Sequence, residues 1–206
     1  MGSKISIAVL ASGRGSNFQA IINGIAKGEV NADIKVLITN NPEAQAIERA
    51  KKAKIPIEII DEKKSGMREQ LDLEIKKTLD KYNVDLVVLA GYMKLIKSKE
   101  LLQAYRNRII NIHPSLLPAF QGLHAQKQAF DYGAKVSGLT IHFLDEQLDH
   151  GPIIYQEAVD ISDCKDEEEA AEKILNREHK AYKKVIDSFS KGKYVIEGRR
   201  AKFVPY

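Results

Sequence analysis

Short apolar runs alternate with segments of helical spacing through the first half of the chain. The apolar runs are rich in β-branched residues and are bounded by turn residues, which is typical of buried strands. They cover residues 4–10, 34–38, 57–60 and 85–90. Apolar residues recur every three or four positions after Ser16 and again over 67–82, which predicts amphipathic helices. This alternation predicts a doubly wound, mostly parallel sheet with right-handed crossovers.

The pattern changes after Asn111, where two strands are expected to follow each other directly. The predicted elements are a helix at 126–132, strands at 136–144 and 153–159, a helix at 167–189 and a small C-terminal strand. Because only residues 145–152 separate the two strands, we expect them to pair as antiparallel neighbours. No repeat, low-complexity tract or linker interrupts the sequence. We therefore predict one α/β domain over residues 1–206, a three-layer, Rossmann-like sheet with an antiparallel C-terminal part.

Composition and charge narrow the class of protein. The net charge of +4 is small for 206 residues, and the lysines are scattered among acids, so they indicate solvated helix faces and no nucleic-acid-binding surface. The single cysteine, Cys164, cannot form an internal disulfide, and no Cys/His cluster suggests a metal site. No apolar run is long enough to span a membrane, and the N-terminus lacks the apolar stretch of a signal peptide. We expect a cytoplasmic protein without a metal.

A glycine-rich loop after the first strand is the first candidate site. The sequence Ser12-Gly-Arg-Gly-Ser-Asn17 lies before a helix N-terminus, where backbone N–H groups and the helix dipole favour an anion. The loop fits neither a dinucleotide fingerprint, which needs a small residue where Phe18 stands, nor a P-loop, which needs Gly-Lys-Ser/Thr. A site for one phosphate remains, held by Gly15, Ser16 and Asn17. The alternative is a strand-to-helix turn with Ser16 as N-cap.

The segment Asn111-Ile-His-Pro-Ser-Leu-Leu-Pro118 is the second candidate site. Asn111 and His113 are two residues apart, so their side chains lie on one face of an extended backbone. Pro114 should end the strand. A carboxamide and an imidazole side by side can hold a carbonyl oxygen and move a proton, but a strand-end cap with a satisfied histidine is an equally good interpretation. His142, alone among apolar residues, is more typical of a core histidine than of a catalytic one.

Two further stretches could complete such a site. In the acidic turn at 145–152, Gly151 permits an unusual backbone angle, and Asp149 could approach His113 across the sheet. A carboxylate beside an imidazole orients the ring and can make a proton shuttle. The apolar loop at 91–96 follows a buried strand and could cover a flat aromatic ligand, although core packing is at least as good an interpretation.

Taken in order, these segments resemble a known family, the phosphoribosylglycinamide formyltransferases, which are folate-dependent enzymes of purine synthesis. The segments that carry the resemblance are 8–17, 89–93, 111–118 and 149–152. The resemblance extends from the first strand to the helix that contains Glu178 and His179. The Asn-Ile-His-Pro-Ser-Leu-Leu-Pro motif with a distant Asp-x-Gly-Pro is specific for the formyltransferase superfamily, and the Gly-Ser-Asn loop narrows it to enzymes that bind a ribose phosphate.

This resemblance implies a reaction and its catalytic residues. The glycinamide amine attacks the formyl carbon of the co-substrate 10-formyltetrahydrofolate, which gives a tetrahedral intermediate and requires no metal. His113 is implied as the catalytic acid, Asn111 as its partner on the formyl oxygen, and Asp149 as the carboxylate that supports the histidine. A relay through His113, Asp149 and a water would move the proton from the amine to the folate nitrogen.

The resemblance also implies the binding residues. Gly15, Ser16 and Asn17 match the loop for the substrate phosphate, and Glu178 matches a carboxylate that contacts glycinamide ribonucleotide. The residues that match folate-binding positions are Arg68, Met93, Lys94, Leu95, Ile96 and Asn111. The sequence departs from the familiar pattern at His150, where smaller or acidic residues are usual, and at Lys94, where arginine is also seen.

Three alternatives have distinct requirements. A formyltetrahydrofolate hydrolase normally carries an N-terminal regulatory domain, for which there is no room before Lys4. A methionyl-tRNA formyltransferase needs a further RNA-binding domain and a more basic surface. A non-catalytic folate- or phosphate-binding module has no need of Asn111, His113 and Asp149 together. We expect small-molecule substrates, no nucleic-acid or membrane partner, and a monomer or weak homodimer.

Overall fold

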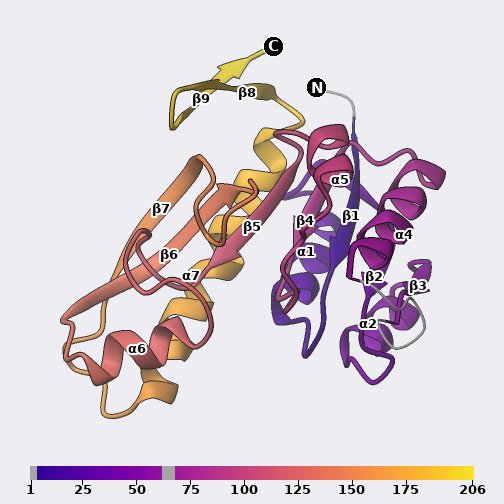
Figure 1. Ribbon diagram of the computed structural model, residues 1–206. Helices are drawn as coiled ribbons and strands as arrows, with labels where there is room; N and C mark the ends of the chain where they lie inside the picture. Colours follow the sequence, from indigo (N-terminus) through magenta and orange to yellow (C-terminus); the bar gives the residue numbers. More distant parts are fainter. Residues whose placement is uncertain (1–3, 62–67) are drawn as a thin grey trace.

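The computed structural model describes residues 4–61 and 68–206. In these ranges nine strands form one sheet, in the order β3-β2-β1-β4-β5-β6-β7-β9-β8, with helices on both faces (Figure 1). The strands are β1 (Ile5–Leu10), β2 (Ala32–Thr39), β3 (Ile57–Ile59), β4 (Leu86–Leu89), β5 (Ile109–His113), β6 (Val136–Phe143), β7 (Ile153–Asp160), β8 (Gly192–Glu197) and β9 (Arg200–Pro205). The helices are α1 (Ser16–Ala26), α2 (Ala46–Lys52), α4 (Arg68–Lys81), α5 (Lys99–Ala104), α6 (Ala125–Asp131) and α7 (Glu167–Ser188).

The first five strands are parallel, so their carboxyl ends lie at one edge of the sheet. Leu10 of β1 is in register with Leu89 of β4, which is in register with Asn111 of β5. Because neighbouring strands are about 4.8 Å apart, the ends of β1 and β5 are separated by roughly 10 Å. The loops that follow β1, β4 and β5 therefore lie side by side, which brings the candidate sites together.

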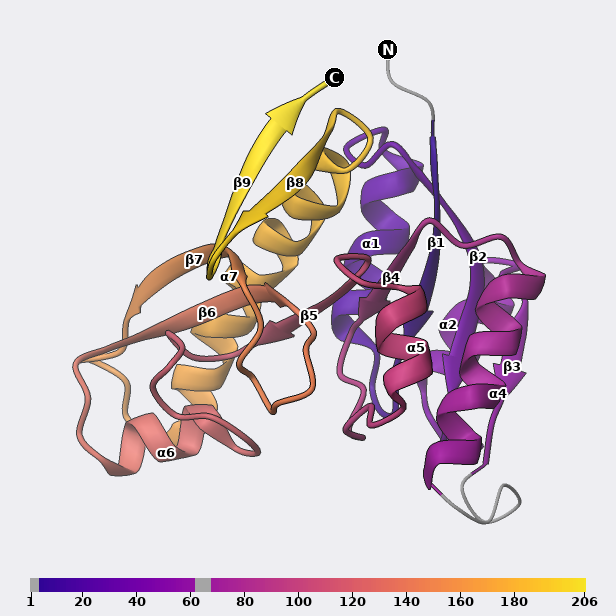
Figure 2. The ribbon, with the colours of Figure 1, turned by 45° about the horizontal axis from the view of Figure 1, so that its top comes forward.

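Alternate residues of the parallel strands enter two different cores. Ile7 and Val9 of β1 face a core made with α1, α2 and α7, whereas Ala8 and Leu10 face one made with α4 and α5. Figure 2 shows α4 and α5 in front of the sheet and α1 and α7 behind it. The predicted three-layer, mostly parallel sheet is confirmed. Within the described residues, no helix is long and apolar enough to cross a membrane.

The C-terminal half supplies the antiparallel part. β6 pairs antiparallel with β7, as the short connection between these two strands predicted, and it also pairs antiparallel with β5. The expectation of one C-terminal strand was wrong, because β8 and β9 form a hairpin around Gly198, which has a φ of 61°. The ring of Tyr194 packs against Phe143 and Phe189, with centroids 6.0 and 5.1 Å away. These aromatic contacts hold the hairpin against β6 and the end of α7.

Candidate active site

Asn111 and His113 lie on β5, and His113 is its last residue, directly before Pro114. The His113 side chain is buried and that of Asn111 is half-buried. The segment after the strand is held by Thr140, whose hydroxyl donates to the Ser115 carbonyl at 2.7 Å and accepts from the Leu117 N–H at 3.0 Å. The strand end and the segment after it are therefore fixed by the antiparallel neighbour β6.

Asp149 reaches His113 from the segment that joins β6 to β7. Its Oδ2 lies 3.4 Å from His113 Nδ1, and both side chains are buried. The same oxygen accepts a hydrogen bond from the backbone N–H of Gly122 at 2.9 Å. The expected approach of this carboxylate to the imidazole is confirmed. Because the other ring nitrogen, Nε2, lies 2.8 Å from the Phe120 carbonyl oxygen, both nitrogens of His113 face acceptors.

The reason for a glycine at 151 differs from the one expected. Gly151 does not have a positive φ, whereas Asp149 does, at 50°. A Cβ at position 151 would lie 1.9 Å from the carbonyl oxygen of Phe143, so the close approach of two backbones excludes a side chain there. The unusual backbone angle belongs to the carboxylate-bearing residue itself.

His142 contacts the site, although it was expected to be a core histidine. It is buried, and its Nδ1 donates to the Phe143 carbonyl oxygen at 2.8 Å. Burial lowers the pKa of His142, which favours the neutral ring. Nε2 is then an acceptor, and the Asn111 amide nitrogen donates to it at 3.2 Å. One amide hydrogen of Asn111 is thereby occupied, and among the described residues this amide nitrogen has no second acceptor. Asn111 and His142 are paired in the register between β5 and β6, and this register was not predicted from the sequence.

The loop after β1 leads into α1 with Gly15 as the N-cap, so the alternative interpretation, which had Ser16 as the N-cap, was wrong. Gly15 has a φ of 67°, and a Cβ there would lie 2.9 Å from the Cβ of Ala46. Ser16 is the first helical residue, where backbone N–H groups lack helical partners. Arg49 stabilises the loop, since its Nε donates to the Arg14 carbonyl oxygen at 2.8 Å.

Asn17 of α1 and Glu178 of α7 meet where these two helices pack together, and the Asn17 amide donates to the carboxylate at 2.8 Å. Both side chains are buried. Burial raises the pKa of Glu178, and the hydrogen bond from Asn17 opposes this shift. One helical turn further on, Tyr182 donates to the Leu89 carbonyl oxygen at 2.7 Å, which fixes α7 against the end of β4. This anchoring sets the position of Glu178 beside the loop.

Ser12 links the loop after β1 to the loop after β4, and sequence reasoning did not assign it a role of its own. Its buried hydroxyl accepts from the Met93 N–H at 2.9 Å and donates to the Asn40 side chain at 2.6 Å. The Ser12 N–H also donates to the Gly91 carbonyl oxygen at 3.0 Å. The two candidate binding loops are thus held together through one serine.

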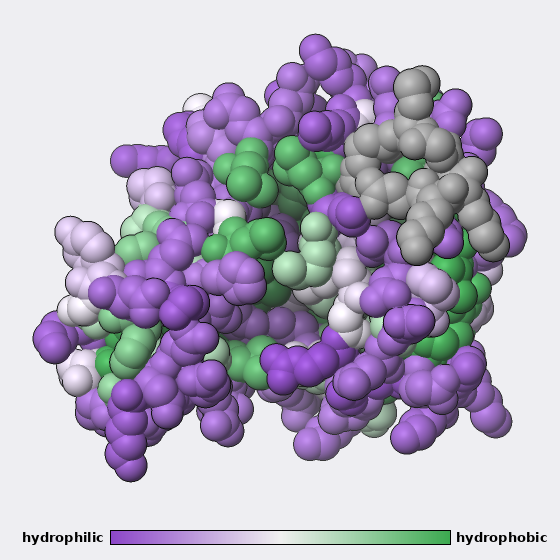
Figure 3. All heavy atoms as spheres, turned by 60° about the horizontal axis from the view of Figure 1, so that its bottom comes forward, coloured by the Kyte–Doolittle hydropathy of each residue, from purple (hydrophilic) through white to green (hydrophobic). Residues whose placement is uncertain are grey.

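The stretch expected to bind a folate is only partly open. Met93 and Leu95 are 59% and 38% exposed, and Lys94 is half-buried. Ile96 is buried in the core with α4 and α5, so its side chain packs as the alternative interpretation stated. The side chain of Arg68 lies outside the described residues. Figure 3 shows the face toward which the parallel strands run, with apolar residues gathered around a hollow near its middle.

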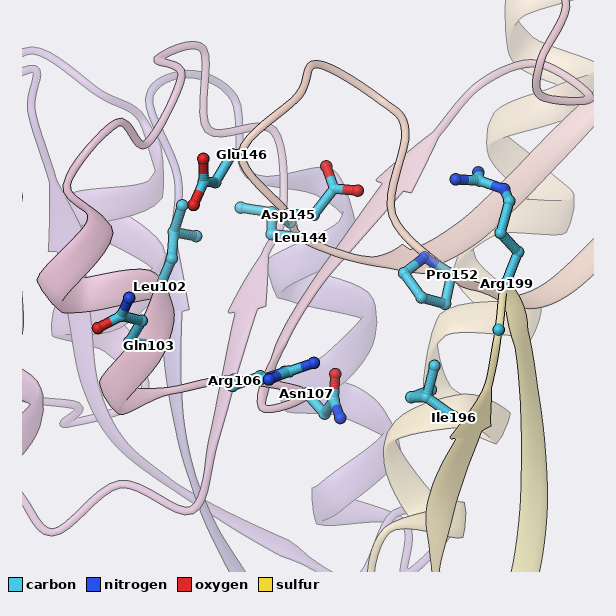
Figure 4. A pocket seen from close by; sticks show the side chains of 11 residues that line it. Leu102, Gln103, Arg106, Asn107, Leu144, Asp145, Glu146, Pro152, Ile196 and Arg199 are labelled. Carbon is cyan, nitrogen blue, oxygen red and sulfur yellow. The ribbon is translucent and has the colours of Figure 1, made fainter.

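Two cavities flank the segment that carries Asp149. One of about 360 Å³ lies beside Asp149 and is also lined by Leu117, Pro118 and Gln121. The other, of about 410 Å³, lies between α5, the start of the segment and the C-terminal hairpin, and contains none of the predicted site residues (Figure 4). Across residues 4–61 and 68–206, no group of three or more His, Cys, Asp or Glu side chains is arranged to hold a metal ion.

Comparisons with known proteins agree with this geometry. The family model described as formyl transferase matches residues 5–186. The chain is 44% identical over 179 residues to phosphoribosylglycinamide formyltransferase of Bacillus subtilis (strain 168), with 87% of this chain and 91% of the relative covered. It is 35% identical to the trifunctional purine biosynthetic protein adenosine-3 of Gallus gallus, of which it spans 19%, with 92% of this chain covered. Glycinamide ribonucleotide transformylase 1 of Symbiobacterium toebii superposes with a TM-score of 0.94 at 43% identity, covering 99% of this chain and 96% of that one.

Proposed function

The chain belongs to the formyl transferase family, and we propose that it transfers the formyl group of 10-formyltetrahydrofolate to the amine of glycinamide ribonucleotide, a step of purine synthesis. One observation carries the proposal. Asn111, His113 and Asp149 meet at the edge of the sheet, and the glycine loop that starts α1 lies two strands away. A phosphate bound at this loop would leave the amine end of the substrate directed toward the three side chains.

The chemistry follows from donors aimed at the formyl oxygen. The amine nitrogen bonds to the formyl carbon, and the carbonyl electron pair moves onto oxygen. Asn111 and protonated His113 would donate to that oxygen, and removal of one such donor typically costs about 10²–10³ in rate. His113 Nε2 would exchange the Phe120 carbonyl for this oxygen when substrate binds. The carbon–nitrogen bond to the folate then breaks, while the amine loses a proton and the folate nitrogen gains one.

The two substrates would occupy the two loops that Ser12 joins. Backbone N–H groups at Gly15, Ser16 and Asn17 suit the phosphate, because the helix dipole favours negative charge there. Glu178, paired with Asn17, would accept from the hydroxyl groups of the ribonucleotide. The folate would lie over Met93 to Ile96, and the family resemblance adds Arg68 as a further folate-binding residue.

The test uses the purified full chain with 10-formyltetrahydrofolate, with and without glycinamide ribonucleotide. Deformylation only in the presence of the amine, with formylated ribonucleotide as product, supports the transferase. Turnover without the amine would replace it by a formyltetrahydrofolate hydrolase. Binding of either ligand without turnover would leave a non-catalytic module. His113→Ala, assayed as folded protein, should lose transfer by about 10²-fold or more.

We also propose that the chain works as one cytoplasmic domain, a monomer or weak homodimer with small-molecule substrates and no nucleic-acid or membrane partner. The continuous sheet and the mixed surface charge support this. Light scattering across a concentration series tests the oligomeric state. A stable higher oligomer would contradict it.

A further inference from the structure

His150 and Arg199 join the C-terminal hairpin to the segment that carries Asp149. Arg199 lies in the turn between β8 and β9, beyond the residues 5–186 that the family model matches. Its guanidinium donates from Nη2 to the His150 carbonyl oxygen at 2.5 Å, and Nη1 lies beside the imidazole, 2.9 Å from Nε2 and 3.4 Å from Nδ1. Figure 4 shows Arg199 reaching from this turn toward the segment that carries Asp145.

The other ring nitrogen of His150 faces Asp145. Nδ1 lies 2.7 Å from the Asp145 carboxylate, which can only accept, so Nδ1 carries the proton. Arg199 Nη1 contacts the same ring, closer to Nε2 than to Nδ1. The three side chains therefore form a continuous series of contacts from the hairpin turn to Asp145.

The segment held by these contacts contains the residue that faces His113. Asp149 has a φ of 50°, a conformation that is unfavourable for a residue with a side chain and persists where neighbouring contacts support it. On one side, Gln121 Nε2 donates to the Asp149 carbonyl oxygen at 3.2 Å. On the other side, Arg199 donates to the carbonyl oxygen of His150, the residue after Asp149. Arg199 also lines both cavities that flank the segment.

We propose that Arg199, acting through His150, is a positioning residue for Asp149 in formyl transfer. The inference rests on the proposed function, in which Asp149 supports His113. Without the guanidinium, the His150 carbonyl loses this hydrogen bond, so the Asp149 carboxylate spends less time within reach of the His113 imidazole. This loss affects the chemical step, because neither Arg199 nor His150 belongs to the proposed substrate loops.

Kinetic constants of variants in the full chain test this. Arg199→Ala should lower kcat by about three- to tenfold, the effect of a lost positioning hydrogen bond, with both KM values within about twofold. Arg200→Ala is the matched control, because among the described residues its side chain makes no hydrogen bond or ion pair. His150→Asn should retain about half or more of kcat, since an amide can donate to Asp145 and accept from Arg199. Adding His150→Ala to Arg199→Ala should cause little further loss.

Amide hydrogen exchange provides a readout that does not depend on activity. In Arg199→Ala, residues 145–152 should exchange faster than in the wild type, while the β8–β9 hairpin keeps its protection. Wild-type kcat together with unchanged exchange in this variant would overturn the proposal, as would a fall of equal size in Arg200→Ala. If the wild-type chain shows no formyl transfer, the proposed function fails, and the exchange of 145–152 alone decides whether Arg199 holds the segment.

Discussion

Asp149→Asn isolates the negative charge that faces His113. An asparagine has nearly the same size, its carbonyl oxygen can accept from the Gly122 N–H, and it tolerates the φ of 50° better than most residues. The fold should therefore persist. A neutral acceptor in place of a carboxylate weakens one hydrogen bond by about 1 kcal/mol, which corresponds to a fall of about 2–4 °C in Tm for a chain of this size.

The expected loss of rate follows from the distance. At an effective dielectric constant of about 20, a carboxylate 3.4 Å from an imidazolium attracts it by roughly 5 kcal/mol. Residual solvent and the substrate itself reduce this value, so about 3–4 kcal/mol of support should be lost in the transition state, which is a fall in kcat of about 10²–10³.

The assay is the initial rate of formyl transfer at saturating concentrations of both substrates, with Tm measured on the same samples. Glu146→Gln is the matched control. It removes one negative charge from the same segment, but its carboxylate is 63% exposed and its ion pair, with Lys99, is 3.9 Å long. This control should keep its rate within about twofold, because exposed pairs contribute little. A kcat of Asp149→Asn within about threefold of the wild type, at an unchanged Tm, would remove this carboxylate from the mechanism.

Three further variants test the binding loops. Ser16→Asp should raise the KM for the ribonucleotide about tenfold or more by like-charge repulsion, with little effect on the KM for the folate; equal effects on the two KM values would move the phosphate elsewhere. Glu178→Gln removes a carboxyl group whose pKa is raised by burial. Such a group contributes its full stability to the fold only below its ordinary pKa of 4.5, and this contribution is lost as the pH rises through the raised pKa. The variant should therefore exceed the wild type in thermal stability at about pH 8 and match it near pH 4, whereas lower stability at about pH 8 would contradict the shift. Ser12→Ala leaves the Met93 N–H without its acceptor and should lower the free energy of unfolding in urea by about 1–3 kcal/mol and raise the KM for the folate. A wild-type free energy of unfolding together with a wild-type KM would show that the two loops are held without the Ser12 hydroxyl.

Local spacing was enough to predict most of the elements, because strands and helices impose periods of 2 and 3.6 on their own residues. The pair Asn111 and His113 follows from the same rule, since two residues of one strand at this spacing share a face. The hairpin of β8 and β9 was predicted less well. Its strands are short and alternate between buried and exposed residues, which is a weak sequence pattern, and what holds the hairpin is the packing of Tyr194 against Phe143 of β6.

By itself, the sequence determined the alternation of strands and helices, the glycine loop at a helix N-terminus, and the resemblance carried by its motifs. Only the tertiary structure decided which distant groups meet. Asp149 faces His113, His142 holds Asn111, Glu178 pairs with Asn17, and Arg199 reaches His150. The physical reason is that such contacts depend on strand order, on the register between β5 and β6, and on the packing of α7 and the hairpin against the sheet. None of these is fixed by the spacing of residues along one segment.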